Sequence, residues 1–187
     1  MFFAHGLMVR MIEKKDFDIT IIRPEMRQAD FKLRGQGMPS DRLKRIKEGL
    51  QTLHTLETMA ANIYKFQITK KESELNLQLI AAMSNEMTHL QDFQIKLFEY
   101  GFKPSMLRWL YWMVGFKFGF FSRLMGTKAI LRTGIWVEKQ AVRHYDELLR
   151  KIDWDEETRK IIEKDQADEY GHIKRWETFL KKLKVEA

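Results

Sequence analysis

Apolar residues recur at spacings of three and four along four stretches of the chain, which is the period of an amphipathic helix. Ser40, directly after Pro39, is the expected N-cap of the first helix, and Gly101 with Pro104 ends the second. With only three prolines and ten glycines in 187 residues, long helices are favoured over a turn-rich β fold. The expected helices cover about residues 41–69, 75–100, 126–152 and 153–183.

Residues 104–125 depart from this pattern, because aromatic and aliphatic residues fill most positions and only Arg108, Lys117 and Arg123 interrupt them. Aromatics mixed with isolated cations are typical of a segment at a membrane interface. A buried crossover between two helix pairs is the alternative, and both interpretations stay open. No stretch of about 18 uncharged apolar residues occurs, so we expect no transmembrane helix.

Four carboxylates and two histidines lie on the apolar stripes of the four expected helices, where an unpaired charge is costly to bury. The pattern of one Glu followed by Glu-x-x-His occurs twice along the chain. This is the ligand set of two-metal carboxylate proteins with a ferritin-like helical bundle. The six residues are Glu57, Glu86, His89, Glu138, Glu169 and His172.

Each of these six residues taken alone has an ordinary explanation, such as an ion pair or a hydrogen-bonded core histidine. No Lys or Arg shares their stripes, however, and an uncompensated buried charge costs about 3–5 kcal/mol. Two divalent metals would neutralise all four carboxylates. The chain has no Cys, and carboxylate with imidazole ligands favours two iron ions, with manganese as the alternative. Asp165, one turn before Glu169, is expected either to orient a ligand histidine or to be an ordinary helix-start acid.

Over about residues 43–180 the chain resembles the demethoxyubiquinone hydroxylase family, the di-iron monooxygenases of ubiquinone biosynthesis. The resemblance implies an all-α, ferritin-like four-helix bundle with a long aromatic-rich crossover helix between the two helix pairs. It also implies that His144 and Tyr145 lie near two irons, with roles in electron delivery or quinone binding. Besides the six ligands, the matching residues are Ala61-Asn62-Ile63-Tyr64, Gln67, Gly126-Thr127-Lys128-Ala129, Thr133, Val137, His144-Tyr145 and Asp168.

One segment departs from the family. Leu53-His54-Thr55-Leu56 stands directly before Glu57, where the family usually has Asp-His-Ala-Gly. Family members tend to open the channel to the metals near this turn, so a different substrate stays open.

We therefore expect a di-iron oxygenase that hydroxylates a membrane quinone of the demethoxyubiquinone type with O₂ and an external reductant. A second hypothesis keeps the metals without the quinone: a ferritin- or rubrerythrin-like oxidase, peroxidase or ferroxidase. A third, a metal-free basic helical protein that binds membranes or nucleic acid, leaves the six residues unexplained.

The formal net charge of +7 suits a membrane surface, and no nucleic-acid recognition motif accompanies it, so we expect no nucleic-acid partner. The start of the chain lacks a convincing secretory signal, which suggests a cytoplasmic protein peripheral to the inner membrane, on the matrix side if eukaryotic. Exposed apolar helix faces are compatible with a homo-oligomer. Residues 1–39 form an N-terminal arm of unknown role, with a strand or extended segment at residues 17–22, and residues 40–187 form the bundle domain.

Overall fold

The structure is a computed structural model that describes residues 31–185. Every regular element in this range is a helix, which confirms the all-α fold; the segment at residues 17–22 lies outside the described residues. The four helices expected from periodicity agree with the structure to within three residues at each end. The helices are α2 (Ser40–Gln67), α3 (Glu74–Glu99), α4 (Arg108–Leu124), α5 (Thr127–Lys151) and α6 (Glu156–Val185).

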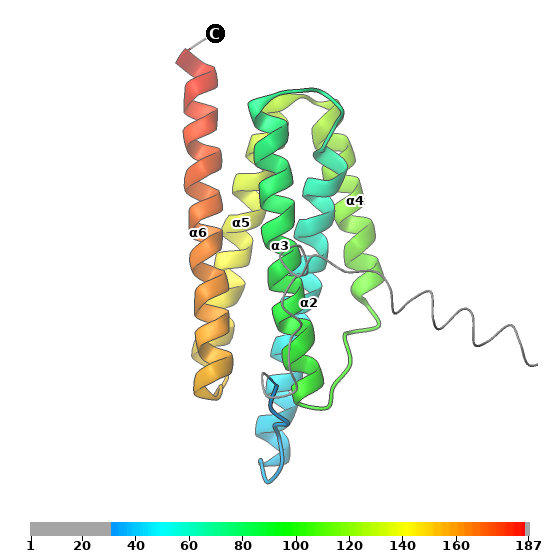
Figure 1. The fold of residues 1–187 in the computed structure, drawn as a ribbon, viewed down its shortest axis with the longest axis vertical. Helices are drawn as coiled ribbons and strands as arrows, with labels where there is room; N and C mark the ends of the chain where they lie inside the picture. Colours follow the sequence, from blue (N-terminus) through cyan, green and yellow to red (C-terminus); the bar gives the residue numbers. More distant parts are fainter. Residues whose placement is uncertain (1–30, 186–187) are drawn as a thin grey trace, which may run out of the picture. The chain divides into compact units, whose positions relative to one another are not determined.

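Two helix pairs form the bundle. Helix α2 packs against α3 and α5 against α6, while α4 lies along the outer side of α2 and returns the chain to the start of α5 (Figure 1). The crossover connection is therefore a helix, as the sequence predicts. Neighbouring helices of each pair run antiparallel, which brings Glu57 of α2 level with the Glu-x-x-His motif of α3.

The helix ends follow local chemistry with one exception. Gly101 after α3 and Gly126 before α5 have φ values of 74° and 89°, in the left-handed region that glycine adopts without strain. The expectation for Ser40 was wrong: Pro39 takes the N-cap position, Ser40 starts the helix, and no side chain caps it. Ser40 is the first helical residue, one position past the cap from which a side-chain oxygen accepts a hydrogen bond of the first turn.

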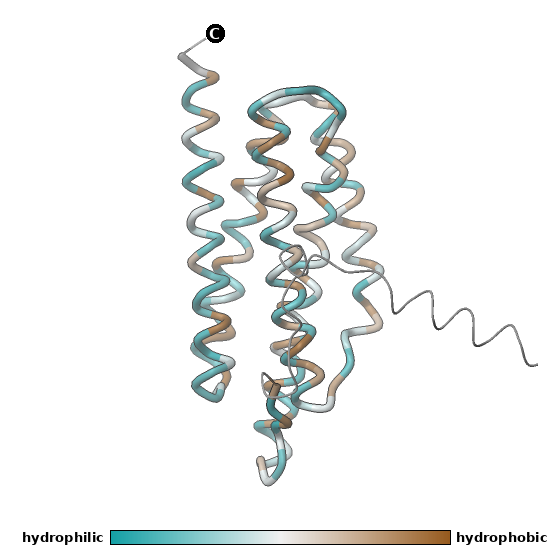
Figure 2. Tube along the Cα trace, in the orientation of Figure 1, coloured by the Kyte–Doolittle hydropathy of each residue, from teal (hydrophilic) through white to brown (hydrophobic). Residues whose placement is uncertain are grey.

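The buried apolar residues form two main clusters at different levels of the bundle. One includes Phe93 and Tyr145, and the other includes Tyr64 and Trp176. The buried Glu and His residues of the two motifs fall between these clusters on every bundle helix, so a polar layer crosses the middle of the core. Figure 2 shows the narrow apolar stripe of α6, a helix that is hydrophilic over most of its surface.

Helix α4 touches α2 through small residues and leaves its large ones outside. A Cβ atom on Gly115 or Gly119 would lie 2.5 Å from the carbonyl oxygen of Met59 or Ile63, respectively, so the two backbones are in close contact. In α4 only these glycines and Ser122 are buried, while Trp109 is 61% exposed. The segment is therefore a crossover between the two helix pairs, but the expectation that it is buried was wrong, because most of its aromatic residues are exposed. No helix within residues 31–185 is both long and apolar enough to cross a bilayer.

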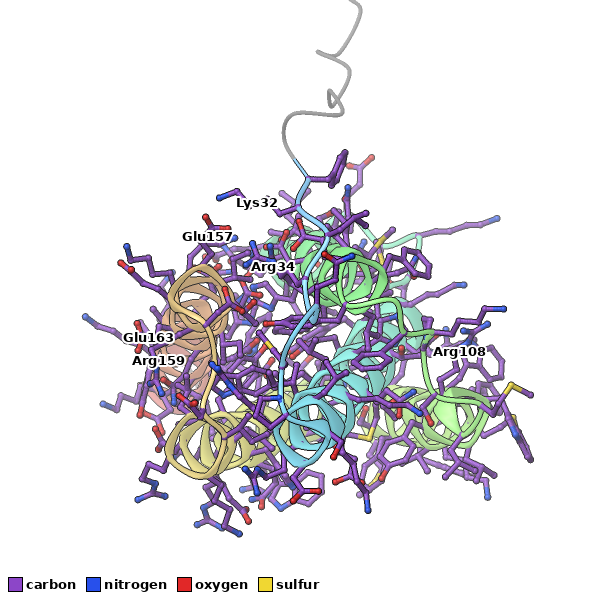
Figure 3. The ribbon with its side chains drawn as sticks, turned by 90° about the horizontal axis from the view of Figure 1, so that it is seen from below. Lys32, Arg34, Arg108, Glu157, Arg159 and Glu163 are labelled. Atoms are coloured by element: carbon purple, nitrogen blue, oxygen red, sulfur yellow. The ribbon has the colours of Figure 1, made fainter. Side chains whose placement is uncertain are left out.

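Arg34 connects the segment before α2 to the ends of two bundle helices. Its guanidinium lies 2.7 Å from Glu99 Oε2 and 2.7 Å from Asp155 Oδ1, and it also pairs with Glu157 (Figure 3). Lys96 Nζ adds a second contact to Glu99 at 2.6 Å. Residues 33–39 therefore belong to the same compact unit as the helices.

Candidate metal centre

All six residues singled out from the sequence meet in the polar layer, and each is at most 1% exposed. Helix α2 supplies Glu57, α5 supplies Glu138, and α3 and α6 each supply a Glu and a His. Two groups have donor atoms within 4.8 Å of one another, and Glu86 and Glu169 belong to both. The arrangement is that of two adjacent metal positions with two shared carboxylates. The groups are Glu57, Glu86, His89 and Glu169, and Glu86, Glu138, Glu169 and His172.

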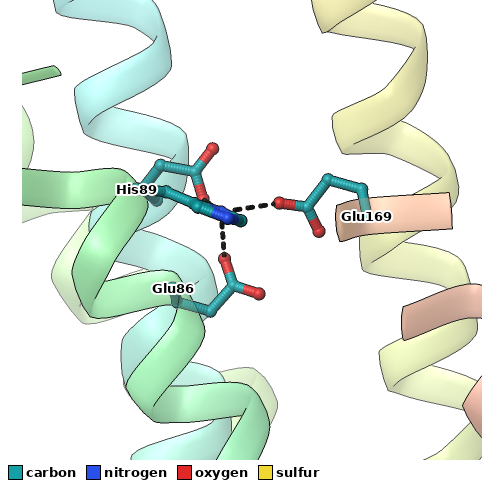
Figure 4. Close-up of side chains that lie close together, drawn as sticks. Glu86, His89 and Glu169 are labelled. Atoms are coloured by element: carbon teal, nitrogen blue, oxygen red, sulfur yellow. Dashed lines mark ion pairs between the residues drawn. The ribbon is translucent and has the colours of Figure 1, made fainter. Parts of the chain in front are cut away.

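Both imidazoles turn Nδ1 toward the carboxylates. His89 Nδ1 lies 3.0 Å from Glu169 Oε1 and 3.8 Å from Glu86 Oε2 (Figure 4). His172 Nδ1 lies 3.0 Å from Glu86 Oε1 and 3.6 Å from Glu138 Oε1. The carboxylates come from all four bundle helices, so the centre forms only when both helix pairs are packed together.

Unsatisfied polar atoms show that this donor set fits metal ions. Both oxygens of Glu86 and of Glu169, Oε2 of Glu138 and Nδ1 of both histidines are buried without a hydrogen-bond partner among the described residues. Among the described residues, no Lys or Arg forms an ion pair with any of the six; their ion pairs join the histidines to carboxylates. Buried polar atoms are normally satisfied, and bare carboxylates are expensive to bury. Two divalent cations would satisfy these atoms and neutralise the four charges.

Burial and the closeness of the carboxylates also shift the pKa values of the residues in this layer. Burial, together with the charges of Glu169 and Glu138, raises the pKa of Glu86 well above its usual range. Burial also raises the pKa of Glu138, to about 7. Burial acts to lower the pKa of His172, but its close contacts with the Glu138 and Glu169 carboxylates raise it to about 9. Protons and metals therefore compete for the same atoms, and metal binding must release protons.

The two unshared carboxylates are each held by a tyrosine from the opposite helix pair. Tyr145 of α5 donates to Glu57 Oε1 of α2 at 2.6 Å, and Tyr64 of α2 donates to Glu138 Oε1 of α5. Each tyrosine follows the Glu of its own helix by seven positions. Trp176 donates in turn to the Tyr64 hydroxyl, at 3.0 Å. These bonds fix one oxygen of each carboxylate and orient the other.

His144, the neighbour of Tyr145, lies outside this layer. It is exposed, and its Nδ1 is 2.8 Å from the backbone oxygen of Gln140. It lines a surface cavity of about 280 Å³ together with Thr55, Leu56 and Tyr111. The segment that departs from the family pattern thus forms part of the same cavity wall as His144.

Asp168, which sequence spacing alone gives no role, is the closest acid to Nε2 of His89, the ring nitrogen that faces away from the shared carboxylates. Its Oδ2 lies 3.2 Å from His89 Nε2 and also accepts a hydrogen bond from Asn85. Asp165 Oδ1 is farther from the same nitrogen, at 4.0 Å, and is buried beside Lys164. The helix-start interpretation of Asp165 was therefore wrong. Asp168 orients His89, as an outer carboxylate does for a metal-ligating histidine.

A four-helix bundle with two Glu and two Glu-x-x-His contributions in its core defines the class of ferritin-like carboxylate metal proteins. Residues 44–178 match the family described as "Ubiquinone biosynthesis protein COQ7". Because the match covers most of the chain, the chain belongs to this family, which confirms the resemblance seen in the sequence.

Individual relatives agree with the family. The chain is 29% identical over 140 residues to "NADPH-dependent 3-demethoxyubiquinone 3-hydroxylase, mitochondrial" of Dictyostelium discoideum, a match that covers 71% of the chain and 64% of the relative. It is 30% identical over 121 residues to "3-demethoxyubiquinol 3-hydroxylase" of Pseudomonas putida (strain W619), covering 64% of the chain and 56% of the relative. The chain thus spans less than two thirds of the length of these relatives.

Proposed function

We propose that this protein is a di-iron monooxygenase that hydroxylates the ring of a demethoxyubiquinone-like quinone, using O₂ and an external reductant. The observation that carries the proposal is the pair of four-residue groups that share Glu86 and Glu169. The family supports the class of substrate: the chain belongs to the COQ7 family, and its relatives are named as hydroxylases of a ubiquinone precursor.

The ligands divide into two roles. Glu86 and Glu169, which belong to both groups, would help to hold both irons, whereas Glu57 with His89 and Glu138 with His172 would each hold one. The iron pair would supply the electrons that activate O₂ for transfer of one oxygen atom to the ring. The chain itself holds the ligands, orients the unshared carboxylates through Tyr145 and Tyr64, and excludes water by burying the layer.

The exposed face of α4 supports contact with a membrane surface, where a quinone lipid resides. Trp109, Trp112 and Phe121 are 61%, 38% and 58% exposed, on a helix that also carries Lys117 and Arg123. Aromatic side chains with interspersed cations are stable at the headgroup level of a bilayer. The protein would accordingly bind one face of the membrane that contains its substrate, and the cavity at His144 is our candidate for contact with the quinone ring or the reductant.

Metal content per chain tests the centre. After anaerobic reconstitution with Fe²⁺, we expect close to two irons per wild-type chain by elemental analysis and a clear loss in the Glu86→Ala, His89→Ala double variant. Glu163→Ala, which removes a carboxylate on the exposed side of α6, serves as the control and should retain both irons. Little or no metal in reconstituted wild type would remove the basis of the proposal.

Product analysis tests the reaction. Reduced, iron-loaded protein supplied with O₂ and a short-chain demethoxyquinone should give the hydroxylated ring. Turnover of many added equivalents of Fe²⁺, without any hydroxylated quinone, would instead identify a ferroxidase and overturn the assignment.

A further inference from the structure

A groove between α4 and α5 has a composition that the metal centre does not explain. Its volume is about 640 Å³, and residues of both helices line it. Phe118, Phe121 and Met125 form its apolar part and are 40%, 58% and 78% exposed. Phe118 is fixed in place by stacking on Trp136, with ring centroids 5.5 Å apart. We refer to this site as the α4–α5 groove.

Three cations line the same groove: Lys117, Lys128 and Arg132. None of them forms an ion pair with an acid in the part of the chain that the structure describes. The sequence explains why: from residue 100 to residue 137 there are six Lys and Arg and neither Asp nor Glu. No acid between residues 100 and 137 therefore compensates the positive charge beside the groove.

The start of α5 adds to this positive potential. The helix begins at Thr127, its N-cap Gly126 provides no side-chain acceptor, and its first turn contains no acidic residue. The N-terminal end of a helix carries a partial positive charge and unpaired N–H groups, both of which favour an anion. Lys128 and Ala129, in this first turn, are groove residues.

An apolar surface edged by cations fits a ligand with an anionic head and a hydrocarbon body. Inorganic phosphate would leave the exposed Phe and Met side chains uncovered, which costs free energy in proportion to apolar area. Lys and Arg near a membrane bind anionic headgroups while their methylene stems cover apolar surface. The groove is continuous with the exposed aromatic face of α4, so a ligand that comes from a bilayer can reach both.

We propose that the α4–α5 groove binds one anionic phospholipid, with its phosphate on the three cations and an acyl chain along the apolar side. This inference rests on the membrane contact in the proposed function, and it adds that the contact selects for negative headgroups. A neutral lipid such as phosphatidylcholine also has a phosphate, but its positive choline group offsets that charge, so it would gain less from the three cations.

Binding of monomeric short-chain lipids tests the groove alone, because no membrane surface is present to which the protein could adsorb. Calorimetry on the full iron-loaded chain would compare dihexanoyl phosphatidylglycerol with dihexanoyl phosphatidylcholine below their micelle concentrations. The test variant is Lys128→Ala, Arg132→Ala, and the matched control is Lys44→Ala, Arg45→Ala, which removes the same charge from exposed positions at the start of α2. We expect phosphatidylglycerol to bind about tenfold more weakly to the test variant and within about twofold of wild type to the control. Equal losses in both variants, or equal binding of the two lipids, would overturn the proposal.

Flotation with vesicles separates this inference from the proposed function. Wild type should bind vesicles of phosphatidylcholine with phosphatidylglycerol more tightly than vesicles of phosphatidylcholine alone. Equal binding to both, with quinone hydroxylation intact, would overturn the groove and leave the hydroxylase assignment standing. If wild type prefers phosphatidylglycerol but does not hydroxylate the quinone, the hydroxylase assignment is overturned and the lipid site in the groove stands.

Discussion

The two tyrosines that donate to the unshared carboxylates have different surroundings, so the two halves of the centre are not equivalent. Tyr64 both donates to Glu138 and accepts from Trp176, so its hydroxyl orientation is determined on both sides. Tyr145 donates to Glu57 and packs on Phe93, which offers no hydrogen bond. Two positions with equivalent ligands thus have different surroundings, and ligand orientation is firmer on the side of Glu138.

Tyr64→Phe should weaken metal binding at the Glu138–His172 position about tenfold, because partners that orient a ligand typically contribute 10–100-fold to affinity. A stepwise Co²⁺ titration followed by visible absorption would resolve the weaker step. Tyr170→Phe, an exposed tyrosine between Glu169 and His172, is the control and should bind as wild type does. Unchanged affinities in Tyr64→Phe would mean that the hydroxyl plays no part in positioning Glu138.

Asp155 gives a pH-dependent contribution to stability at the end of the bundle. Burial acts to raise its pKa, but hydrogen bonds from Thr158 and Tyr100 and the charge of Arg34 lower it below the usual value. An acid with a lowered pKa stabilises the fold above its unfolded pKa of about 3.9, and the contribution is lost as pH falls through the folded value.

Asp155→Ala should therefore lower the free energy of unfolding at pH 7 by about 1–2 kcal/mol, since it also removes the acceptor for Thr158 N at the start of α6. Urea unfolding from pH 7 to pH 3 would show the gap to wild type closing below about pH 4. Glu156→Ala, a neighbouring exposed acid, is the control. A gap that stays constant over this range would contradict the role of the ionised carboxylate.

At the scale of whole elements, α4 depends on two glycines for its position. Gly115 and Gly119 are one turn apart and let the helix backbone contact the carbonyls of Met59 and Ile63 on α2. Larger residues at these positions would push α4 away, and the groove beside α5 would change with it. Because the glycines occupy the contact with α2, most aromatic side chains of α4 are left exposed.

Gly115→Ala and Gly171→Ala should change stability in opposite directions. The first places a methyl group 2.5 Å from a backbone oxygen and should destabilise by about 1–3 kcal/mol. In the second, the added methyl group meets no other atom within 4 Å. This variant should stabilise the fold by about 0.5–1 kcal/mol, because Ala is a better helix former than Gly. Thermal unfolding of both variants would check this, and a stabilised Gly115→Ala would show that α4 is not packed as described.

For the molecule as a whole, the polar layer through the core makes stability depend on pH, and bound metal would change that dependence. Burial raises the pKa of Glu138 to about 7, so its ionised form opposes folding once the pH exceeds the unfolded value of about 4.3. Metal binding reverses this balance, because it stabilises only the folded state.

Glu138→Gln should thus raise the free energy of unfolding of the metal-free protein at pH 8, by an amount on the order of 2 kcal/mol. The gain should shrink at pH 5, where the wild-type carboxyl is protonated. Added Fe²⁺ or Mn²⁺ should stabilise wild type but give little stabilisation to the variant. Unfolding in EDTA and with metal measures both effects, and a variant less stable than metal-free wild type at pH 8 would contradict this account.

The helices and the six candidate ligands could be predicted because both depend on the spacing of residues within single helices. The six proposed ligands were found because helix periodicity places them on the same stripes as core residues, and the structure brings all six together. The bonds from Tyr64 and Tyr145 depend on which helices become neighbours, so the seven-residue spacing alone could not identify their partners. The outward face of α4 was left open for the same reason: two small residues decide which side packs.

The crossed tyrosines have a consequence for the origin of the fold. A helix pair with one Glu, a Tyr seven residues later and a Glu-x-x-His is complementary to a second copy of itself. Two such pairs related by a twofold axis would supply every ligand and both hydroxyl bonds, so a duplicated and fused ancestral dimer is sufficient to produce this centre. In a fused chain the two halves are encoded separately, so a residue can differ between them. Phe93 and Trp176, each four residues after a histidine of the centre and each beside one tyrosine, are positions at which the two halves differ.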